Sequence, residues 1–484
     1  MASKSVLLFR PIYDPESASA PATPWGLLYV AAPLVAHGFD ITIIDESVTP
    51  DYQECVRAAL DKYPVAVGIS AMTGRQIGFG LAFAQFVRKH GNAPIVWGGI
   101  HPTMKPEQTA RHGLVDYVVV NEGEQPFLEL VERLAQGKEP DGIPGVYFVR
   151  NGAICGEPPR DFVDLAALPP IPFDLLDVER YIVRRPDLGA ERSFEICTSR
   201  GCPHRCAFCY IQSVHKSRWR SLDADAAFRQ LSGHVERFDL DCVVFREDNF
   251  FADRRRVEQL AQRMVDERLD IKWTASCRID YFAKYTAEFV DLLRRSGCVL
   301  LTFGVESGSA RILDFIKKDI TPDMVREVVQ KVKDSGIRGT YHFMGGFPTE
   351  TAGELLDTCQ LIEDIRRIAP EAVVREMSAY TAYPGVELIQ TCKELGHREP
   401  DQLEDWLDID FREDPRNSRR PWLNESQSRL LSNIQFLIAR LNHKNSAMRA
   451  WTRRRWRQML ASELGIALPE RPAIEFAKRM IRGR

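Results

Sequence analysis

Two stretches of the chain alternate short β-branched runs with longer amphipathic segments. In the first stretch, which ends near residue 140, apolar residues at helical spacing fill the gaps between the runs. Strand–helix alternation with short connections predicts an open, doubly wound parallel sheet, in which ligands bind beyond the carboxyl ends of the strands. The strands are predicted at residues 5–9, 40–45, 65–70, 94–99 and 117–120.

A second alternating series begins at Ser193 and contains six strand–helix units. Six such units predict a partial (β/α)6 barrel, in which chemistry gathers on the loops at the carboxyl ends of the strands. Between the two series, residues 141–192 contain too many prolines for extended regular structure, which predicts a linker. The barrel is therefore expected over residues 193–395, after a first domain at 1–140. Its strands are predicted at residues 193–197, 241–246, 272–276, 299–306, 339–346 and 374–380.

The chain after residue 395 is predicted to be helical, and from about Arg416 it is basic. Its segment "RAWTRRRWRQML" mixes tryptophan with arginine. We favour a solvated helix that packs on the barrel through its tryptophan and leucine face. An interfacial helix that makes peripheral contact with anionic lipid, or with a partner, stays open as the alternative.

Composition narrows the class of protein. A chain of 484 residues is too long to fold around a single hydrophobic core, so more than one domain is expected. The formal net charge of −3 provides no general attraction to nucleic acid. The first apolar run is too short for a signal peptide, and no segment approaches the roughly 18 apolar residues of a membrane span. We therefore expect a cytoplasmic protein. The eleven cysteines then argue against a disulfide framework.

Three of these cysteines, Cys202, Cys206 and Cys209, form a Cx3CxxC cluster directly after the first strand of the second series. Soft thiolate ligands select zinc, copper(I) or iron–sulfur clusters. A structural zinc site needs four ligands, and His204 would be a cramped fourth because it lies two residues from both Cys202 and Cys206. A [4Fe-4S] cluster held by three cysteines leaves one iron open to another molecule. The sequence therefore favours such a cluster over zinc.

The Cx3CxxC motif and the aromatic residue after it, in this position of a six-unit series, resemble the radical S-adenosylmethionine (SAM) superfamily. In that family the open iron binds the amino and carboxylate groups of SAM. An electron from the cluster cleaves SAM to a 5′-deoxyadenosyl radical, which abstracts hydrogen from the substrate. The resemblance implies a [4Fe-4S] cluster, SAM, a small-molecule substrate and an external electron donor of the flavodoxin or ferredoxin type.

The resemblance also implies contacts to SAM from the strand ends of the second series. Tyr210 matches the aromatic position at the adenine, and Glu247 and Asp248 match acidic positions that can hold the SAM ammonium group. Arg278 matches a position near the SAM carboxylate, although a structural ion pair explains it equally well. The remaining matches are Glu306 and Ser307 facing the ribose and methionine, Gly345 in a glycine loop that a ligand can approach closely, and Tyr383 near the adenine.

The first series resembles the N-terminal domain of the branch that binds cobalamin. The matching segments are "PWGLLYVAAPLVAHGFDITIID", "VGIS", "GGIHPT" and "VDYVVVNEGEQPFLEL", and with the linker the resemblance covers about residues 5–390. The chain lacks the Asp-x-His-x-x-Gly motif that ligates cobalt, so any cobalamin is expected to have no cobalt ligand from the protein. The implied cobalamin contacts are Ser70, Gly98, Gly99, His101, Glu122 and Gly123, of which His101 more readily structures its turn-rich loop.

These features predict a cobalamin-dependent radical SAM enzyme that methylates an unactivated carbon or closes a ring. The alternative is a cobalamin-independent dehydration, epimerisation or rearrangement, for example of a sugar or aminoglycoside, with the first domain as a scaffold. Thiolation or methylthiolation of RNA is disfavoured, because the chain contains no second three-cysteine set and its tail is predicted to be helical. We expect no nucleic-acid partner.

Overall fold

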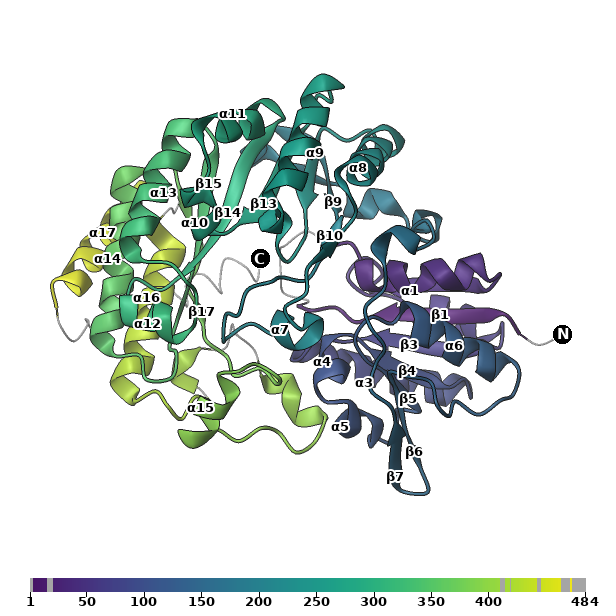
Figure 1. The fold of residues 1–484 in the computed structure, drawn as a ribbon. Coiled ribbons are helices and arrows are strands. Elements are labelled where there is room, and N and C mark those ends of the chain that lie inside the picture. The colour runs from purple at the N-terminus through teal and green to yellow at the C-terminus, as the bar shows by residue number, and fades with distance from the viewer. Residues whose placement is uncertain are drawn as a thin grey trace.

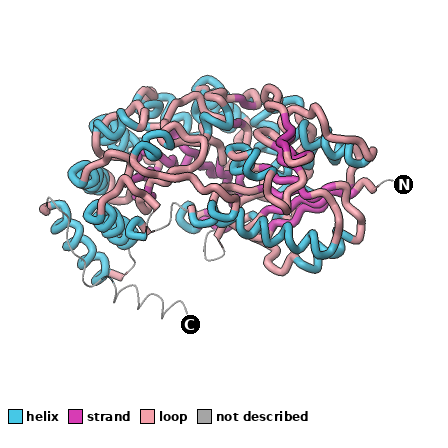
Figure 2. The backbone as a smooth tube through the Cα atoms, turned by 90° about the horizontal axis from the view of Figure 1, so that it is seen from below, coloured by secondary structure: helices cyan, strands magenta, loops and turns pink. Residues whose placement is uncertain are grey.

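The computed structural model describes residues 3–14, 21–409, 414–417, 419–441, 445–462 and 471. Two α/β units lie side by side, and helices from the end of the chain pack against the second unit (Figure 1). Viewed from below, the strands run through the interior and the helices surround them (Figure 2). In the part of the chain that is described, no helix combines the length and apolar composition needed to cross a membrane.

The first unit is a seven-stranded sheet in the order β2-β1-β3-β4-β5-β6-β7. The strands β1 to β5 pair in parallel, and their order grows outward from β1 in both directions, as in a doubly wound sheet. The five strands predicted from the sequence are therefore confirmed. The bounds are β1 Ser5–Arg10, β2 Asp40–Asp45, β3 Ala66–Ser70, β4 Ile95–Gly98, β5 Tyr117–Val119, β6 Val146–Arg150 and β7 Ala153–Gly156.

Alternate residues of the first sheet enter two different apolar clusters. Leu7 and Phe9 of β1 pack with α2 and α3 on one face, whereas Val6 and Leu8 pack with α1 and α6 on the other. This period of two is what places helices on both faces of a parallel sheet. The bounds are α1 Trp25–Ala36, α2 Gln53–Leu60, α3 Arg75–His90, α4 Ile100–Met104, α5 Pro106–Ala110 and α6 Glu124–Ala135.

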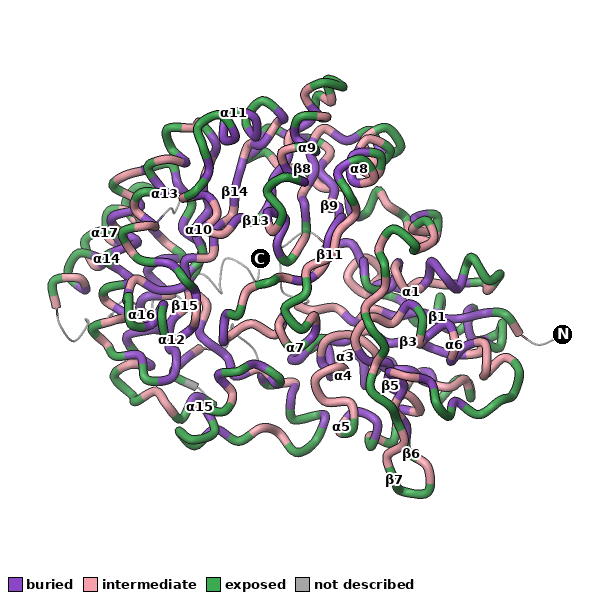
Figure 3. Tube along the Cα trace, in the orientation of Figure 1, coloured by how far each residue is buried: buried purple, intermediate pink, exposed green. Residues whose placement is uncertain are grey.

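The first sheet extends past the boundary that the sequence predicts at residue 140. An antiparallel hairpin, β6 and β7, adds to the edge at β5, although these residues fall within the expected proline-rich linker. Its tip is exposed (Figure 3). The rest of the linker contains short 3-10 helices, in keeping with its prolines. These are η1 Leu165–Ala167, η2 Phe173–Leu175, η3 Val178–Tyr181 and η4 Pro186–Leu188.

The second unit is a curled sheet in the order β8-β9-β12-β13-β14-β15-β16, with β17 also paired to β15. All pairs from β9 onward are parallel, which confirms the partial barrel. The sixth predicted strand is broken into two short strands. The bounds are β8 Val183–Arg185, β9 Ala190–Ile196, β12 Cys242–Phe245, β13 Lys272–Cys277, β14 Cys298–Glu306, β15 Arg338–Gly345, β16 Val373–Val374 and β17 Ser378–Ala379.

Helices cover the outside of the curled sheet and share one large apolar cluster with it (Figure 1). Several begin with an Asp, Ser or Thr whose side chain accepts a hydrogen bond from a free backbone N–H of the first turn. The bounds are α7 Ile211–His215, α8 Ala224–Phe238, η5 Phe250–Ala252, α9 Arg254–Asp266, α10 Ile279–Ala283, α11 Ala287–Arg295, α12 Ala310–Phe315, α13 Pro322–Ser335 and α14 Ala352–Ile368.

The C-terminal region contacts both units. Trp406 packs in the apolar cluster of the first sheet, whereas Trp456 is buried in that of the barrel and Trp451 packs against the same cluster. The described part of the tail thus agrees with the solvated-helix interpretation; membrane contact stays a prediction, and residues 463–470 and 472–484 lie outside the described residues. The bounds are α15 Ile389–Glu394, η6 Glu404–Asp408, η7 Pro415–Asn417, α16 Glu425–Leu441 and α17 Ser446–Leu460.

Candidate active site

The three clustered cysteines lie on a loop between β10 (Ser199–Arg200) and α7. Gly201, at the start of this loop, has φ of +83°, and a Cβ there would lie 2.1 Å from the carbonyl oxygen of Arg218. Its backbone N–H donates to Asp248 over 2.8 Å. The entry into the cysteine loop is therefore a position that only glycine can occupy.

All three cysteines are free thiols, and N–H donors point at two of their sulfurs. Asn249 Nδ2 lies 3.3 Å from Cys202 Sγ, and Arg278 Nη1 lies 3.5 Å from Cys206 Sγ. Burial raises the pKa of the Cys209 thiol to about 12, so a thiolate there needs a cationic partner. Soft sulfur donors with N–H groups directed at them fit an iron–sulfur cluster.

The histidine inside the cysteine loop is directed at a tyrosine. His204 Nε2 lies 2.6 Å from the hydroxyl of Tyr281 and is thus engaged outside the cysteine set. Among the described residues, no three His, Cys, Asp or Glu side chains are close enough together to hold a single metal ion. The preference for a cluster over a closed four-ligand zinc site therefore still rests on the number of ligands in the motif.

Glu247 and Asp248 follow β12 and both bind the segment that leads into the cysteine loop. Glu247 accepts hydrogen bonds from the Thr198 backbone N–H over 2.7 Å and from its hydroxyl over 2.6 Å. It also accepts one from the hydroxyl of Ser199. Burial raises the pKa of Glu247, and the nearby charge of Arg256 opposes this shift. In this state the acidic pair positions the loop, and its contact with the SAM ammonium stays a prediction.

Arg278 and Glu306 meet near the cysteine loop through Lys318. Lys318 Nζ lies 2.7 Å from Glu306 Oε1, and both side chains are buried. The backbone oxygen of Lys318 accepts a hydrogen bond from Arg278 Nη2 over 2.8 Å, and Arg278 also binds Asp280 over 2.7 Å. The Lys318 ammonium lies 5.7 Å from the ring centroid of Phe208, which is part of the cysteine loop. An acid and two cations are thus gathered beside the expected SAM position.

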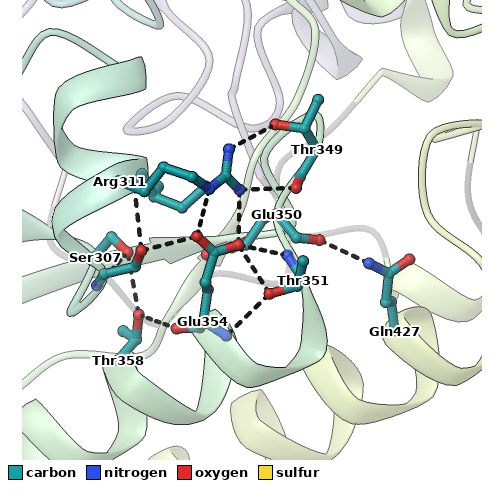
Figure 4. A network of polar contacts seen from close by, with 10 residues as sticks. Ser307, Arg311, Thr349, Glu350, Thr351, Glu354, Thr358 and Gln427 are labelled. Atoms are coloured by element: carbon teal, nitrogen blue, oxygen red, sulfur yellow. Dashed lines mark hydrogen bonds and ion pairs between the residues drawn. The ribbon is translucent and has the colours of Figure 1, made fainter.

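Ser307 and the loop after β15 belong to a polar network at the start of α14 (Figure 4). The Ser307 hydroxyl lies 3.2 Å from that of Thr358, and Arg311 binds Glu354 by two hydrogen bonds of 2.7 Å. Glu350 accepts from the backbone N–H groups of residues 346 and 347. The network fixes the "GGFPTET" loop to the helix that follows it, and the contact of Ser307 with SAM stays a prediction.

Gly345, at the end of β15, has little free space beside it. A Cβ there would lie 2.9 Å from Leu355 and from Met377, and 3.0 Å from Leu431. The absent side chain thus serves close packing of α14 and α16 on the strand. A close approach of SAM to this glycine stays a prediction.

The two tyrosines predicted near the adenine belong to different elements of the structure. Tyr210 directly precedes α7, and burial raises its pKa. Tyr383 follows β17 and packs against the apolar cluster of the first sheet. Tyr383 thus lies where the barrel meets the first unit.

The lumen of the partial barrel contains a cavity of about 1510 Å³. Hydroxyl groups line its wall on the strands, and Glu247 borders it at the carboxyl end of β12. Residues of α16 and the segment before it line the opposite side. The hydroxyl-bearing strand residues are Thr274, Ser276, Thr302 and Thr340.

A second cavity, of about 320 Å³, lies at the carboxyl edge of the first sheet. Its wall is mostly apolar, with Leu27, Val30 and Phe127 among its members. Three residues that flank the cysteine loop close its other side, namely Arg200, Val214 and His215. Five of the six residues that the resemblance implies for cobalamin line this cavity: Ser70, Gly98, Gly99, Glu122 and Gly123.

His101, the sixth, does not line the cavity. It is fully buried, its Nδ1 lies 3.0 Å from the Thr73 hydroxyl, and its ring centroid lies 5.2 Å from that of Trp406. Burial and the charge of Lys105 lower its pKa to about 3, so the imidazole is neutral. The buried side chain and its contact with Thr73 agree with the favoured interpretation that His101 structures its loop, and a contact with cobalamin stays a prediction.

Three residues near the site were not predicted from the sequence. Lys318, Asn249 and Arg200 approach the cysteines or the second cavity from segments that the cysteine motif does not include. Asn249 directly follows Glu247 and Asp248, which the sequence already places after a strand, so this position is a usable signal. For Lys318 the signal was weaker, since its partner lies twelve residues away on another element.

Comparisons with known proteins agree with this geometry. The family profile described as the radical SAM superfamily matches residues 196–362, and that of the B12 binding domain matches residues 16–131. An uncharacterized methyltransferase of Pyrococcus horikoshii is 32% identical over 369 residues, which is 75% of this chain and 77% of the relative. An anaerobic magnesium-protoporphyrin IX monomethyl ester cyclase of Rubrivivax gelatinosus is 26% identical, over 81% of this chain and 70% of the relative.

Two solved structures share the fold. The radical SAM methyltransferase TsrM from Kitasatospora setae, with cobalamin and a [4Fe-4S] cluster bound, aligns with a TM-score of 0.64. It is 19% identical and the match covers 82% of this chain and 76% of that one. The cobalamin-dependent radical SAM enzyme OxsB aligns with a TM-score of 0.71 at 17% identity, over 94% of this chain and 71% of that one.

Proposed function

Because this chain belongs to the branch of the radical SAM superfamily that carries an N-terminal B12-binding domain, we propose that it methylates an unactivated carbon of a small-molecule substrate with cobalamin. One observation carries the proposal. The segment around the three cysteines contacts both cavities: Thr198 binds Glu247, which borders the barrel cavity, and Arg200 and His215 line the cavity of the first sheet.

The chemistry assigns a separate task to each group. The [4Fe-4S] cluster would be held by Cys202, Cys206 and Cys209, and it supplies the electron that cleaves SAM. Cobalamin would bind in the mostly apolar cavity at the first sheet, and it supplies a methyl group to a carbon radical.

The residues of this chain orient the reactants and exclude water. The Glu306–Lys318 pair offers one carboxylate and one ammonium, which match the opposite charges of the SAM amino-acid group. The apolar wall of the second cavity keeps water from its occupant, and the hydroxyl groups of the barrel wall can hold a polar substrate.

Ring closure is the second candidate, and similarity to the Rubrivivax cyclase favours it. It begins with the same hydrogen abstraction. The cobalamin-independent reaction, with the first unit as a scaffold, is the remaining alternative. The similarity to a cytidylyl-2-hydroxyethylphosphonate methyltransferase of Streptomyces wedmorensis, 24% identical over 78% of this chain and 79% of the relative, supports methyl transfer.

The test is anaerobic reconstitution with iron, sulfide and hydroxocobalamin, followed by gel filtration. We expect a retained cobalamin absorption band and about four irons per chain. On addition of SAM and dithionite, S-adenosylhomocysteine should form together with 5′-deoxyadenosine. Formation of 5′-deoxyadenosine alone, with no cobalamin retained, would replace this proposal by the cobalamin-independent reaction.

A further inference from the structure

We propose that the barrel cavity takes an anionic substrate, and that Arg375 binds its oxyanion, which is a carboxylate or a phosphate-type group. The inference rests on the proposed function, since it takes this cavity to be the place where substrate meets the radical. It adds the chemical class of the substrate and the residue that recognises it.

Most arginines that line the cavity are close to acidic partners. Asp187 binds Arg185 over 3.0 Å, and Glu195 lies 3.5 Å from Arg246. Asp414 is likewise shared by two further arginines of this wall. Arg338 lies 4.0 Å from Asp187, and Arg440 donates a hydrogen bond to the backbone oxygen of Phe436 over 2.8 Å. Each of these arginines thus has a protein partner that a charged ligand would have to displace.

Arg375 differs from them. It lies between β16 and β17, lines the cavity and is exposed to it. Within the described residues, its guanidinium forms no hydrogen bond or ion pair. Glu371 and Glu376 also face the cavity, and neither is paired with Arg375. Among the described residues of the cavity wall, Arg375 is therefore a guanidinium whose five N–H donors are unused, whereas the other arginines already have protein partners.

The neighbours of Arg375 extend the site along the strands. The imidazole of His342, on β15, is influenced by two charged neighbours. Burial and the charge of Arg375 lower the pKa of His342, whereas the charge of Glu306 raises it. A neutral imidazole can both donate and accept a hydrogen bond. Thr302 and Thr340 add hydroxyl groups on the same wall. This set suits an oxyanion with polar substituents.

Guanidinium is matched to such a ligand by geometry. Its planar fork can donate two parallel N–H bonds to a carboxylate or phosphate group, and it stays charged at every relevant pH. The two cavities thus differ in character: the one at the first sheet is mostly apolar, whereas the barrel cavity combines hydroxyl groups with one unused cation. We infer that charge at this point orients the substrate for hydrogen abstraction.

The experiment uses two fluorescent probes and the full chain. Anilinonaphthalene sulfonate carries an oxyanion, and N-phenyl-naphthylamine is the same skeleton without it. We expect Arg375→Gln to weaken binding of the sulfonate about 3- to 10-fold and to leave binding of the neutral probe unchanged. Because the sulfonate also enters apolar cavities, the comparison is between variants rather than between absolute affinities.

The matched control is Arg246→Gln, which removes an arginine of the same cavity that already has an acidic partner. It should change neither affinity, and Arg375→Lys, which keeps the charge and loses the planar fork, should bind the sulfonate with an affinity between those of wild type and Arg375→Gln. An unchanged sulfonate affinity in Arg375→Gln, or an equal loss for both probes, would overturn the inference. The binding assay needs neither cluster nor SAM, so its outcome is separate from cobalamin retention and SAM cleavage, which test the proposed function.

Discussion

The guanidinium of Arg200 lies 3.1 Å from Glu122 Oε1, and this contact ties the cysteine loop to the carboxyl edge of the first sheet. Arg220 binds the same carboxylate over 2.7 Å, and the backbone N–H of Val163 donates to it over 2.9 Å. The side chain of Glu122 is only 8% exposed. Glu122 thus borders the cavity at the first sheet, while its oxygens bind groups that join the two units.

We expect Glu122→Ala to destabilise the protein by about 3 to 5 kcal/mol, because it leaves the partly buried Arg220 without a carboxylate and Arg200 with Glu124 alone. The measurement is urea unfolding, with proteolysis of residues 141–192 as a second readout of separation between the units. The control is Glu129→Ala, which removes the carboxylate partner of the exposed Arg160. Equal stability of the two variants would contradict the role given to Glu122.

Replacing any one of Cys202, Cys206 and Cys209 by Ala should abolish production of 5′-deoxyadenosine and lower the iron content. The reason is that three thiolates are the fewest that leave a single iron open for SAM. Cys55→Ala is the control, because Cys55 is an exposed thiol outside the cluster and should keep full iron. Undiminished 5′-deoxyadenosine from a cluster variant would refute the cluster assignment.

Glu306→Gln and Lys318→Met should each weaken SAM binding about 10-fold without removing iron, since each deletes one charge that matches the SAM amino-acid group. Equilibrium binding of SAM to the reconstituted protein measures the effect. The neighbouring Lys317→Met removes a cation that pairs with Glu387 near the surface, and it should bind SAM normally. Loss of iron in Lys318→Met would show instead that the residue supports the cluster loop.

His101→Ala should cost about 2 to 4 kcal/mol of stability and leave cobalamin retention unchanged. The side chain is buried against Trp406 and is not part of the cavity wall, so its removal creates a void rather than losing a ligand. Thermal unfolding and the cobalamin absorption band after gel filtration measure the two effects. Cobalamin loss at unchanged stability would support the alternative, in which His101 contacts the cofactor.

Glu350 makes stability depend on pH. Burial raises its pKa from 4.5 to about 8, so the folded protein binds this proton more tightly than the unfolded chain does. The stabilisation is complete below pH 4.5 and is lost as pH rises through about 8. Glu350→Gln cannot ionise, so its free energy of unfolding relative to wild type should rise with pH between 5 and 8, by up to about 1.4 kcal/mol per unit.

The measurement is denaturant unfolding at several pH values for both proteins. Glu425→Gln is the comparison, because the Glu425 side chain is 87% exposed and its replacement should add no such slope. A difference between Glu350→Gln and wild type that does not vary with pH would show that Glu350 is ionised in the fold.

Strands could be predicted because their apolar runs are bounded by polar turns. The runs at 40–45 and 272–276 appear in the structure within one residue of these bounds. The β6-β7 hairpin was missed because prolines on both sides gave the segment the composition of a linker. The packing of Trp406 against the first sheet could not be predicted from hydrophobic periodicity. It depends on contacts with helix α3 and with Gln108, about 300 residues away in the chain.

In the candidate site too, features with a local sequence pattern could be predicted, whereas features set by tertiary contacts could not. A local spacing identified the cysteines, and the strand-end rule placed Ser70 and Gly98 at one cavity. Side-chain direction was beyond reach: His101 follows the same strand as Gly98 and Gly99, yet it turns into the core. The Glu306–Lys318 pair and the contact of Asn249 with Cys202 depend on tertiary distances that no sequence period records.

The close approach of the Arg218 backbone to Gly201 bears on how mutational scans of this protein should be interpreted. With the Arg218 carbonyl 2.1 Å from where a Cβ would stand, every substitution at position 201 must displace the loop that follows it. A saturation library scored by turnover would then rank this glycine with the cysteines. Intolerance at a position can therefore report backbone clearance, and an assignment of chemistry needs a direct assay of the metal.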